Sequence, residues 1–371
     1  MITPFGLRHI LLMRDLQSCS TIVDVNSILA EPVSPLRAAL RGYFLGPASG
    51  IFTYVLQARD HQTVLRGFAQ TRVHGADLWS VVCLAPALDN SPLGSRSAGE
   101  DAATIWYRLL LHLCIAAGEH GVQRLFARLL ADGPAEEVFR QAGFAVYVHE
   151  QVFTRLAAQG TGKLSSRLHP VQNEDLWHIQ KLYHKVTPRL VLQVEEADAT
   201  TGNCGPLELL FPPGLTRTKW SGRAGLLSPS ALFRPQLYAE QGYALWGHNG
   251  EILGYLCILM GARGSWLRIM VCPGEQDRAA EMLDHALAVL AGSPVERDAG
   301  SAPRPVYCAV REYQGGMQAL LEERGFVPFN NYSLLVKHTT VRIRQPLRKL
   351  THALEKRAEI APTVSQSGEL H

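Results

Sequence analysis

The sequence predicts an α/β protein built from two tandem copies of one domain, each a mixed, twisted β-sheet flanked by helices. Three observations predict this fold: length, composition and an internal repeat. The chain has 371 residues, which is too long for one ordinary core and suits two domains. Hydrophobic residues make up 47% of it and charged residues 19%, so we expect large packed cores rather than disorder.

The first repeated block predicts two strands around a glycine-containing turn. It covers residues 65–86 and again residues 252–273, with aromatic and β-branched residues in both runs. A glycine, a tryptophan and a proline keep their spacing in the two copies: Gly67, Trp79 and Pro86, then Gly254, Trp266 and Pro273. Two unrelated domains would rarely share such an ungapped match, so duplication is the better interpretation.

The second repeated block predicts a strand, a turn, a short helix and a final strand. The strands begin at Leu125 and Tyr307, and the helices end at Gly143 and Gly325, where glycine enters the left-handed region without steric cost. Between the two blocks, apolar residues recur with helical spacing. The predicted long helices are 102–118 and 277–290, and the final strands are 144–156 and 326–338.

The front of each unit is less similar between the copies. We expect first strands at 6–16 and 164–170, followed by helices at 21–30, 36–43 and 173–185. Residues 198–230 are rich in Gly, Pro, Ser and Thr and predict a long loop inside the second unit.

Charge and cysteine usage limit the class of protein. The formal net charge of +3 and the pI near 8.5 are too mild to predict nucleic-acid binding. The seven cysteines form no CxxC pair, and no segment reads as a signal peptide or a membrane span, so we expect a cytoplasmic protein without membrane association. Residues 341–371 form a basic tail; a solvated surface helix is the expected interpretation, and an RNA-linked role stays open.

The order of elements resembles the GNAT superfamily of N-acyltransferases. The most specific part of the resemblance is the helix that ends in Gly-Phe, at 138–144 and again at 320–326. The resemblance implies an N-terminal GNAT-like domain over residues 1–157, a linker over 158–163 and a C-terminal GNAT-like domain over 164–340.

The resemblance also implies where acetyl-CoA or another acyl-CoA binds. In that family the pyrophosphate lies on free amides at the start of the long helix, and the thioester lies beside a bulge in the central strand. Carried onto this chain, the implied cofactor-binding residues are Val271, Cys272, Gly274, Arg278 and Ala279 in the second copy, and Cys83, Leu84, Arg96 and Gly99 in the first.

The chain departs from the family at several of these positions. Ala279 stands where glycine is expected, and Glu275 and Glu281 bring negative charge to the phosphate position. The tyrosine that protonates the leaving thiolate in many members is replaced by Phe139 and Leu321.

Three other groups are candidates for the chemistry. Tyr313, at the end of the strand that begins at Tyr307, is the candidate for the missing acid, against an ordinary packing role. Cys83 and Cys272 lie beside the expected thioester, but we expect buried apolar side chains rather than nucleophiles. Glu195 is a candidate contact for an amine, against the commoner solvated carboxylate.

Two functional hypotheses follow. The first is direct transfer of an acyl group from acyl-CoA to the primary amine of a small molecule or peptide, without a metal, since no residues show metal-ligand spacing. The alternative is a non-catalytic acyl-CoA-binding or scaffold protein with degenerate GNAT domains. The oligomeric state does not follow from the sequence.

Overall fold

The structure is a computed structural model. It describes residues 1–23, 34–60, 63–74, 78–88, 96–156, 162–195, 239–261, 263–292 and 304–339. The predicted loop 198–230, the tail 341–371 and most of the predicted helix 21–30 lie outside the described residues.

The N-terminal half contains the predicted order of strand, strand, helix, strand, helix, strand, preceded by further elements. Its strands are β1 (Ile2–Pro4), β2 (Thr21–Ile22), β3 (Ile51–Asp60), β4 (Thr63–His74), β5 (Leu78–Ala85), β6 (Arg124–Leu130) and β7 (Ala145–Leu156). Its α-helices are α1 (Ile10–Leu16), α3 (Pro35–Leu45), α4 (Arg96–Glu119) and α5 (Pro134–Gln141).

The C-terminal half repeats this order. Its strands are β8 (Leu168–Pro170), β9 (Ala239–Trp246), β10 (Ile252–Met260), β11 (Ser265–Val271), β12 (Pro305–Arg311) and β13 (Val327–His338). Its α-helices are α6 (Leu176–Val186), α7 (Arg189–Glu195), α10 (Gln276–Gly292) and α11 (Met317–Glu323). The prediction of two α/β units of one design is therefore confirmed.

The front of each unit differs from the prediction. Residues 6–16 form a short 3-10 turn and α1 instead of a strand, because His9, Leu12 and Met13 turn toward the core with helical rather than alternating spacing. The predicted helix 21–30 begins with strand β2. Strands β3 and β9 precede the matched blocks and were missing from the predicted set.

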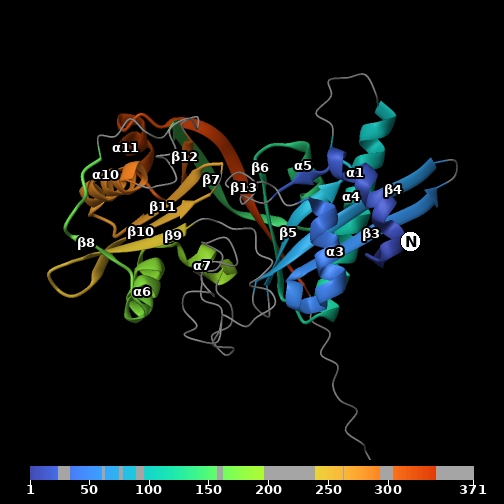
Figure 1. The fold of residues 1–371 in the computed structure, drawn as a ribbon, viewed down its shortest axis with the longest axis horizontal. Coiled ribbons are helices and arrows are strands. Elements are labelled where there is room, and N and C mark those ends of the chain that lie inside the picture. Colours follow the sequence, from blue (N-terminus) through green and yellow to red (C-terminus); the bar gives the residue numbers. More distant parts are fainter. Residues whose placement is uncertain are drawn as a thin grey trace, which may run out of the picture.

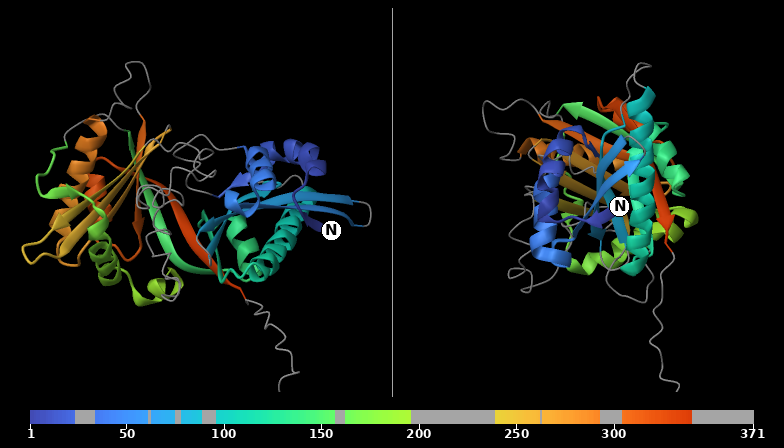
Figure 2. Two further views of the ribbon diagram at one scale, coloured as in Figure 1. Left: turned by 60° about the horizontal axis from the view of Figure 1, so that its bottom comes forward. Right: turned by 90° about the vertical axis from the view of Figure 1, so that its right-hand side faces the viewer.

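The described strands form one 13-stranded sheet that runs through both halves (Figures 1 and 2). Its order is β1-β3-β4-β5-β6-β13-β7-β12-β11-β10-β9-β8, with β2 paired to β5. The last strand of each half pairs with the other half: β13 is antiparallel to β6, and β7 is antiparallel to β12. The two exchanged strands also pair with each other, so they form the bridge between the halves.

Helices cover both faces of the sheet. In the N-terminal half, α4 and α5 pack against a core that includes Trp106 and Phe139, and α1 and α3 cover the opposite face around Met13. In the C-terminal half, α10 and α11 cover one face and α6 the other. Gly143 and Gly325 have φ of 84° and 78°, which confirms their predicted place after α5 and α11.

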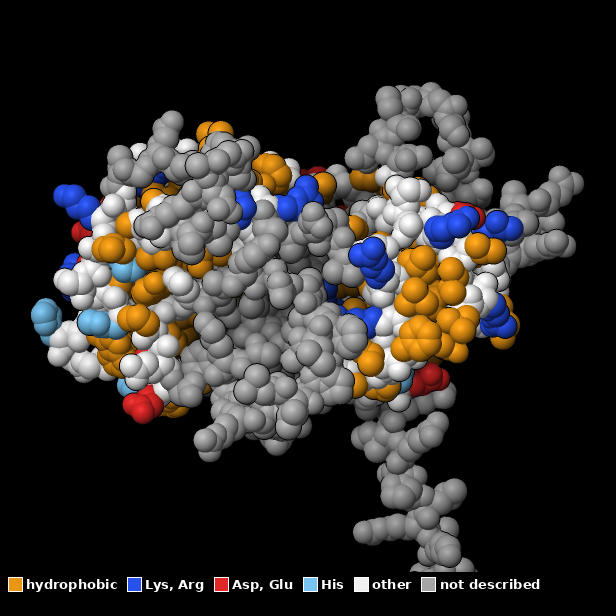
Figure 3. Space-filling model, viewed as in Figure 1, with side chains coloured by type: hydrophobic (Ala, Val, Ile, Leu, Met, Phe, Trp, Pro, Cys, Tyr) orange, Lys and Arg blue, Asp and Glu red, His pale blue; other side chains and the backbone are white. Residues whose placement is uncertain are grey.

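One face of the N-terminal half carries exposed apolar side chains. Figure 3 shows hydrophobic side chains gathered over α3, with basic side chains around them. Leu11 on α1 is 65% exposed and Phe44 on α3 is 70% exposed. Among the described helices, none is long and apolar enough to cross a membrane.

Candidate functional site

An opening between two parallel strands marks the candidate site in the C-terminal half. Strands β11 and β12 pair in parallel only from Ser265–Leu267 to Val306–Cys308 and then separate. The chain leaves β11 through Gly274, whose φ is 90°, and enters α10 at Gln276. Hence the positive dipole end of α10 lies just beyond the end of β11.

Backbone groups of β11 face this opening. The amide of Cys272 donates to the carbonyl oxygen of Leu253 on the β10 side (2.8 Å). The carbonyl of Ile269 points to the other side, where it accepts from Gln314 Nε2 (2.9 Å). Because backbone groups alternate along a strand, the N–H and C=O of Val271 face the same way as those of Ile269, into the opening.

The loop after β12 closes the base of the opening. Gln314 Oε1 accepts from the amide of Arg311 (2.9 Å) while its Nε2 donates to Ile269, so one side chain joins the separated strands. A Cβ added at Gly316 would lie 4.0 Å from Gln276 Cγ. The loop and the start of α10 therefore face each other across the opening.

The start of α10 carries both signs of charge. Arg278 lies 3.3 Å from Glu275 and 3.7 Å from Glu281, and Glu281 also accepts from Ser165 Oγ (2.5 Å). Ala279 is buried in the core of this half. An approaching phosphate would therefore meet Arg278 together with its two carboxylate partners.

The N-terminal half has the corresponding opening, but its own chain fills it. Strands β5 and β6 pair in parallel only from Leu78–Ser80 to Arg124–Phe126. Beyond this point β2 pairs with the free edge of β5, with Thr21 opposite Leu84 and Ile22 opposite Cys83. The amide of Val23 donates to the carbonyl oxygen of Val82 (3.0 Å).

The bulge expected in the central strand occurs in one copy. The register of β4 and β5 shifts between Gln70 and Thr71, which leaves Val82 as the extra residue of β5. Strands β10 and β11 pair without a shift from Gly254–Val271 to Met260–Ser265. Thus the half with the bulge has the filled opening. In the other half the central strand is regular, and no strand of the described residues pairs with this edge of β11 beyond Leu267.

The remaining residues proposed for the first copy lie near this filled opening or at the start of α4. Burial raises the pKa of the Cys83 thiol to about 12, so this thiol stays protonated at neutral pH and is no nucleophile. Cys272 is also buried. Arg96 and Gly99 lie in α4, in a part whose side chains the structure does not describe.

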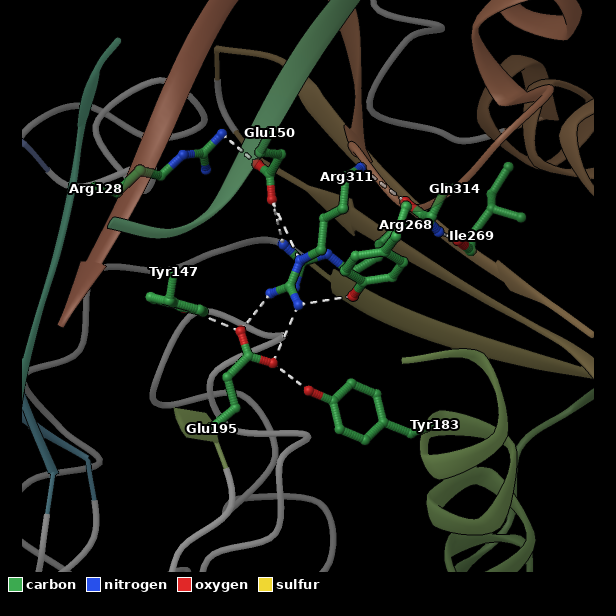
Figure 4. Close-up of polar contacts among 10 residues, drawn as sticks. Arg128, Tyr147, Glu150, Tyr183, Glu195, Arg268, Ile269, Arg311 and Gln314 are labelled. Carbon is green, nitrogen blue, oxygen red and sulfur yellow. Dashed lines mark hydrogen bonds and ion pairs between the residues drawn. The ribbon is translucent and has the colours of Figure 1, made fainter. Parts of the chain in front are cut away.

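Tyr313 lies two residues after the end of β12 and contacts a buried ionic network. Figure 4 shows this network around Arg311 and Glu195. Its hydroxyl oxygen accepts from Arg311 Nη1 (3.0 Å). The guanidinium of Arg311 also donates to both oxygens of Glu195, at 3.1 Å and 2.8 Å. Glu195 further accepts from Tyr147 Oη (3.0 Å) and from Tyr183 Oη.

A second buried carboxylate, Glu150 on β7, lies among three arginines. Its nearest oxygens are 2.6 Å from Arg128 Nη2, 3.5 Å from Arg268 Nη2 and 3.8 Å from Arg311 Nε. Burial raises the pKa of Glu150, but the three guanidinium groups outweigh burial and hold the pKa below its ordinary value. Glu150 is therefore charged at neutral pH.

Burial and nearby charges also determine the protonation states of Arg311 and Tyr147. Burial lowers the pKa of Arg311, but Glu195 and the neighbouring tyrosines together outweigh burial and leave the pKa raised, so Arg311 keeps its charge. Burial, followed by the charge of Glu195, raises the pKa of Tyr147, so this tyrosine keeps the proton that it donates to Glu195.

The sequence identified Tyr313 but not the network around it. Glu195, a predicted amine contact, is 1% exposed and held by Arg311, so its carboxylate is not available to an amine from solvent. Phe139 and Leu321 are fully buried core side chains. The described residues contain no group of His, Cys, Asp and Glu that could hold a metal ion.

Comparisons with solved structures find similar folds. A tandem GNAT protein from the clavulanic acid biosynthesis pathway is 14% identical, with 91% of this chain and 98% of that chain covered and a TM-score of 0.45. A GCN5-related N-acetyltransferase from Sphaerobacter thermophilus is 13% identical, with 91% and 95% covered and a TM-score of 0.43. A putative acetyltransferase from Pyrococcus horikoshii is 11% identical, with 92% and 90% covered and a TM-score of 0.42.

The sequence comparisons add no relative: no protein-family model matches the chain, and no curated protein matches it. The chain is thus similar to solved GNAT proteins, including a tandem one, over about 91% of its length. Because these identities and TM-scores are low, they decide nothing about activity.

Proposed function

We propose that the protein transfers an acyl group from acyl-CoA to a primary amine, and that the C-terminal half holds the donor. The observation that carries this proposal is the separation of β11 and β12 beside the start of α10. The edge at Val271 offers backbone groups to an extended thioester arm, and the amides at the start of α10 offer an anion site for the pyrophosphate. The N-terminal half binds no second donor, because β2 occupies its opening.

Tyr313 is the proposed acid. A hydroxyl carries one hydrogen and can accept two hydrogen bonds. Because Tyr313 Oη already accepts from Arg311, its own hydrogen points elsewhere and can be donated. In the reaction, the neutral amine attacks the thioester carbonyl carbon, the C–N bond forms and the C–S bond breaks. The thiolate takes the proton of Tyr313, and the proton lost by the amine nitrogen passes to water.

The test is calorimetric titration of the full chain with acetyl-CoA and with CoA, followed by a screen of amine acceptors. We expect one site per chain. Gly274→Ala should weaken binding, because it alters the turn into α10. Gly250→Ala is the matched control: both glycines have positive φ, 90° and 70°, and neither has an atom within 4 Å of an added Cβ.

Both variants should lower the melting temperature to a similar degree, through about 1–2 kcal/mol of backbone strain. Only Gly274→Ala should change the affinity for CoA. If the two variants bind CoA with equal affinity, the donor does not bind at the turn that contains Gly274. No binding of either ligand at millimolar concentration would overturn acyl transfer from acetyl-CoA.

The second candidate is a non-catalytic acyl-CoA-binding protein. Arg278 is engaged by Glu275 and Glu281, which reduces the positive charge available to a pyrophosphate, and neither short helix carries a tyrosine acid. This candidate predicts binding of acyl-CoA without release of CoA in the presence of any amine.

A further inference from the structure

The two halves of the protein share one buried network at the candidate site. Tyr147 and Glu150 belong to the N-terminal half, on the exchanged strand β7, whereas Arg311 and Glu195 belong to the C-terminal half. Arg311 and Glu150 are direct cross-strand partners in the pairing of β12 with β7. The contact between the halves therefore runs through the residue that binds the hydroxyl of Tyr313.

The geometry of Arg311 is fixed from two sides. Its Nη1 and Nη2 bind the two oxygens of Glu195 in a fork, and its Nε faces Glu150 at 3.8 Å. The fork to Glu195 fixes the plane of the guanidinium, so its remaining hydrogen bond, from Nη1 to Tyr313, has a set direction.

Glu195 is fixed by tyrosines from both halves. Tyr183 on α6 donates to one oxygen, and Tyr147 on β7 donates to the other at 3.0 Å. Figure 4 shows the polar groups of Arg311, Tyr147 and Tyr183 pointing toward the carboxylate of Glu195. Loss of the Tyr147 hydroxyl would leave one oxygen of a buried carboxylate with Arg311 alone.

We infer that the N-terminal half completes the site of the C-terminal half: Tyr147 acts as a positioning residue that holds Tyr313 through Glu195 and Arg311. This inference rests on the proposed acyl transfer. It assigns the N-terminal half a role that does not need a donor of its own, which agrees with the β2-filled opening.

The test uses the full chain and three variants. Tyr147→Phe removes one hydroxyl from the network, and Glu195→Gln removes the charge that orients Arg311. Tyr243→Phe is the matched control, since it removes a hydroxyl of the C-terminal half whose partner is Gln241 (3.0 Å). For each we would measure kcat and KM for acetyl-CoA with the best amine from the acceptor screen, and the melting temperature.

A positioning role predicts that Tyr147→Phe lowers kcat by about tenfold to a hundredfold with KM for acetyl-CoA unchanged, because a small misplacement of a reacting group is costly. Tyr243→Phe should leave both constants unchanged. If Glu195→Gln does not fold, Tyr147→Phe decides alone.

Two outcomes would overturn the inference. The activity of the wild-type chain distinguishes them, because it is present in the first outcome and absent in the second. A Tyr147→Phe variant with wild-type kcat, whatever its melting temperature, leaves acyl transfer intact and removes the positioning role. A wild-type chain that neither binds acetyl-CoA nor releases CoA with any amine overturns the proposed function and this inference together.

Discussion

Gly67 and Gly254 hold the same place in the two halves, where a central strand passes beneath the long helix. A Cβ added at Gly67 would lie 2.4 Å from Ile105 Cγ2 and 2.6 Å from the carbonyl oxygen of Ala85. A Cβ added at Gly254 would lie 2.6 Å from Met282 Sδ. All three distances are too short for real contacts, so the repeated glycine is explained by close packing of helix on sheet.

Gly67→Ala and Gly254→Ala should differ in cost although both are buried. At Gly67 the added Cβ would meet a β-branched side chain and a backbone oxygen, which cannot move aside. We therefore expect Gly67→Ala to lower the free energy of unfolding by about 1–3 kcal/mol. At Gly254 the obstacle is a flexible methionine, so the loss should be at the lower end. Urea unfolding followed by circular dichroism measures both, and an equal or reversed order would contradict this account of the packing.

At the scale of elements, each exchanged strand, β7 or β13, forms a side-chain hydrogen bond with the short helix of the other half. The two hydrogen bonds join equivalent positions of the repeat. Ser333 Oγ on β13 donates to Glu136 Oε2 on α5 (2.7 Å), within the protein interior. In the other half, Gln318 Nε2 on α11 donates to Gln151 Oε1 on β7 (2.9 Å), at the surface. The same contact is thus made twice, once buried and once exposed.

This difference in burial predicts different energies for the two contacts. Ser333→Ala would leave Glu136, which is 4% exposed, without one donor, and should cost about 1–3 kcal/mol of the free energy of unfolding. Gln151→Ala removes a surface contact and should change it by less than about 0.5 kcal/mol. Thermal or urea unfolding of the two variants measures these changes. Similar losses of unfolding free energy would show that burial does not determine the strength of this contact.

The repeated elements were predictable because their signals are local. Helical spacing places α4 and α10, and the Gly-Phe endings place α5 and α11. In the structure the amide of Phe144 donates to Phe139 and the amide of Phe326 to Leu321, both at 3.0 Å. Such helix ends depend only on neighbouring residues, so the sequence is sufficient to identify them.

The strand exchange and the network were not predictable from the same signals. The alternation along β7 and β13 defines a strand with one buried face but not which strand lies beside it. Strand β2 is two residues long and leaves no periodic pattern. Arg311 and Glu195 are 116 residues apart, and only the tertiary fold brings them together.

At the scale of the molecule, the exchange makes each half depend on the other. Without the C-terminal half, β6 would lack β13 along one edge, and Glu150 would lose Arg268 and Arg311. Without the N-terminal half, β12 would lack β7, and Arg311 would lose Glu150 and Tyr147. Uncovered edges and broken buried ion pairs both destabilise a fold.

Separate expression of residues 1–160 and 161–371 would therefore test the predicted boundary between domains. We expect neither fragment to give a monomer with cooperative unfolding, because each carries one edge of its sheet uncovered. Mixed or co-expressed, the two fragments should form a 1:1 complex whose melting temperature approaches that of the full chain. Size-exclusion chromatography with light scattering and thermal circular dichroism measure both properties. A fragment that unfolds cooperatively as a monomer would show that its half is an independent domain and that the exchanged strands are not required for folding.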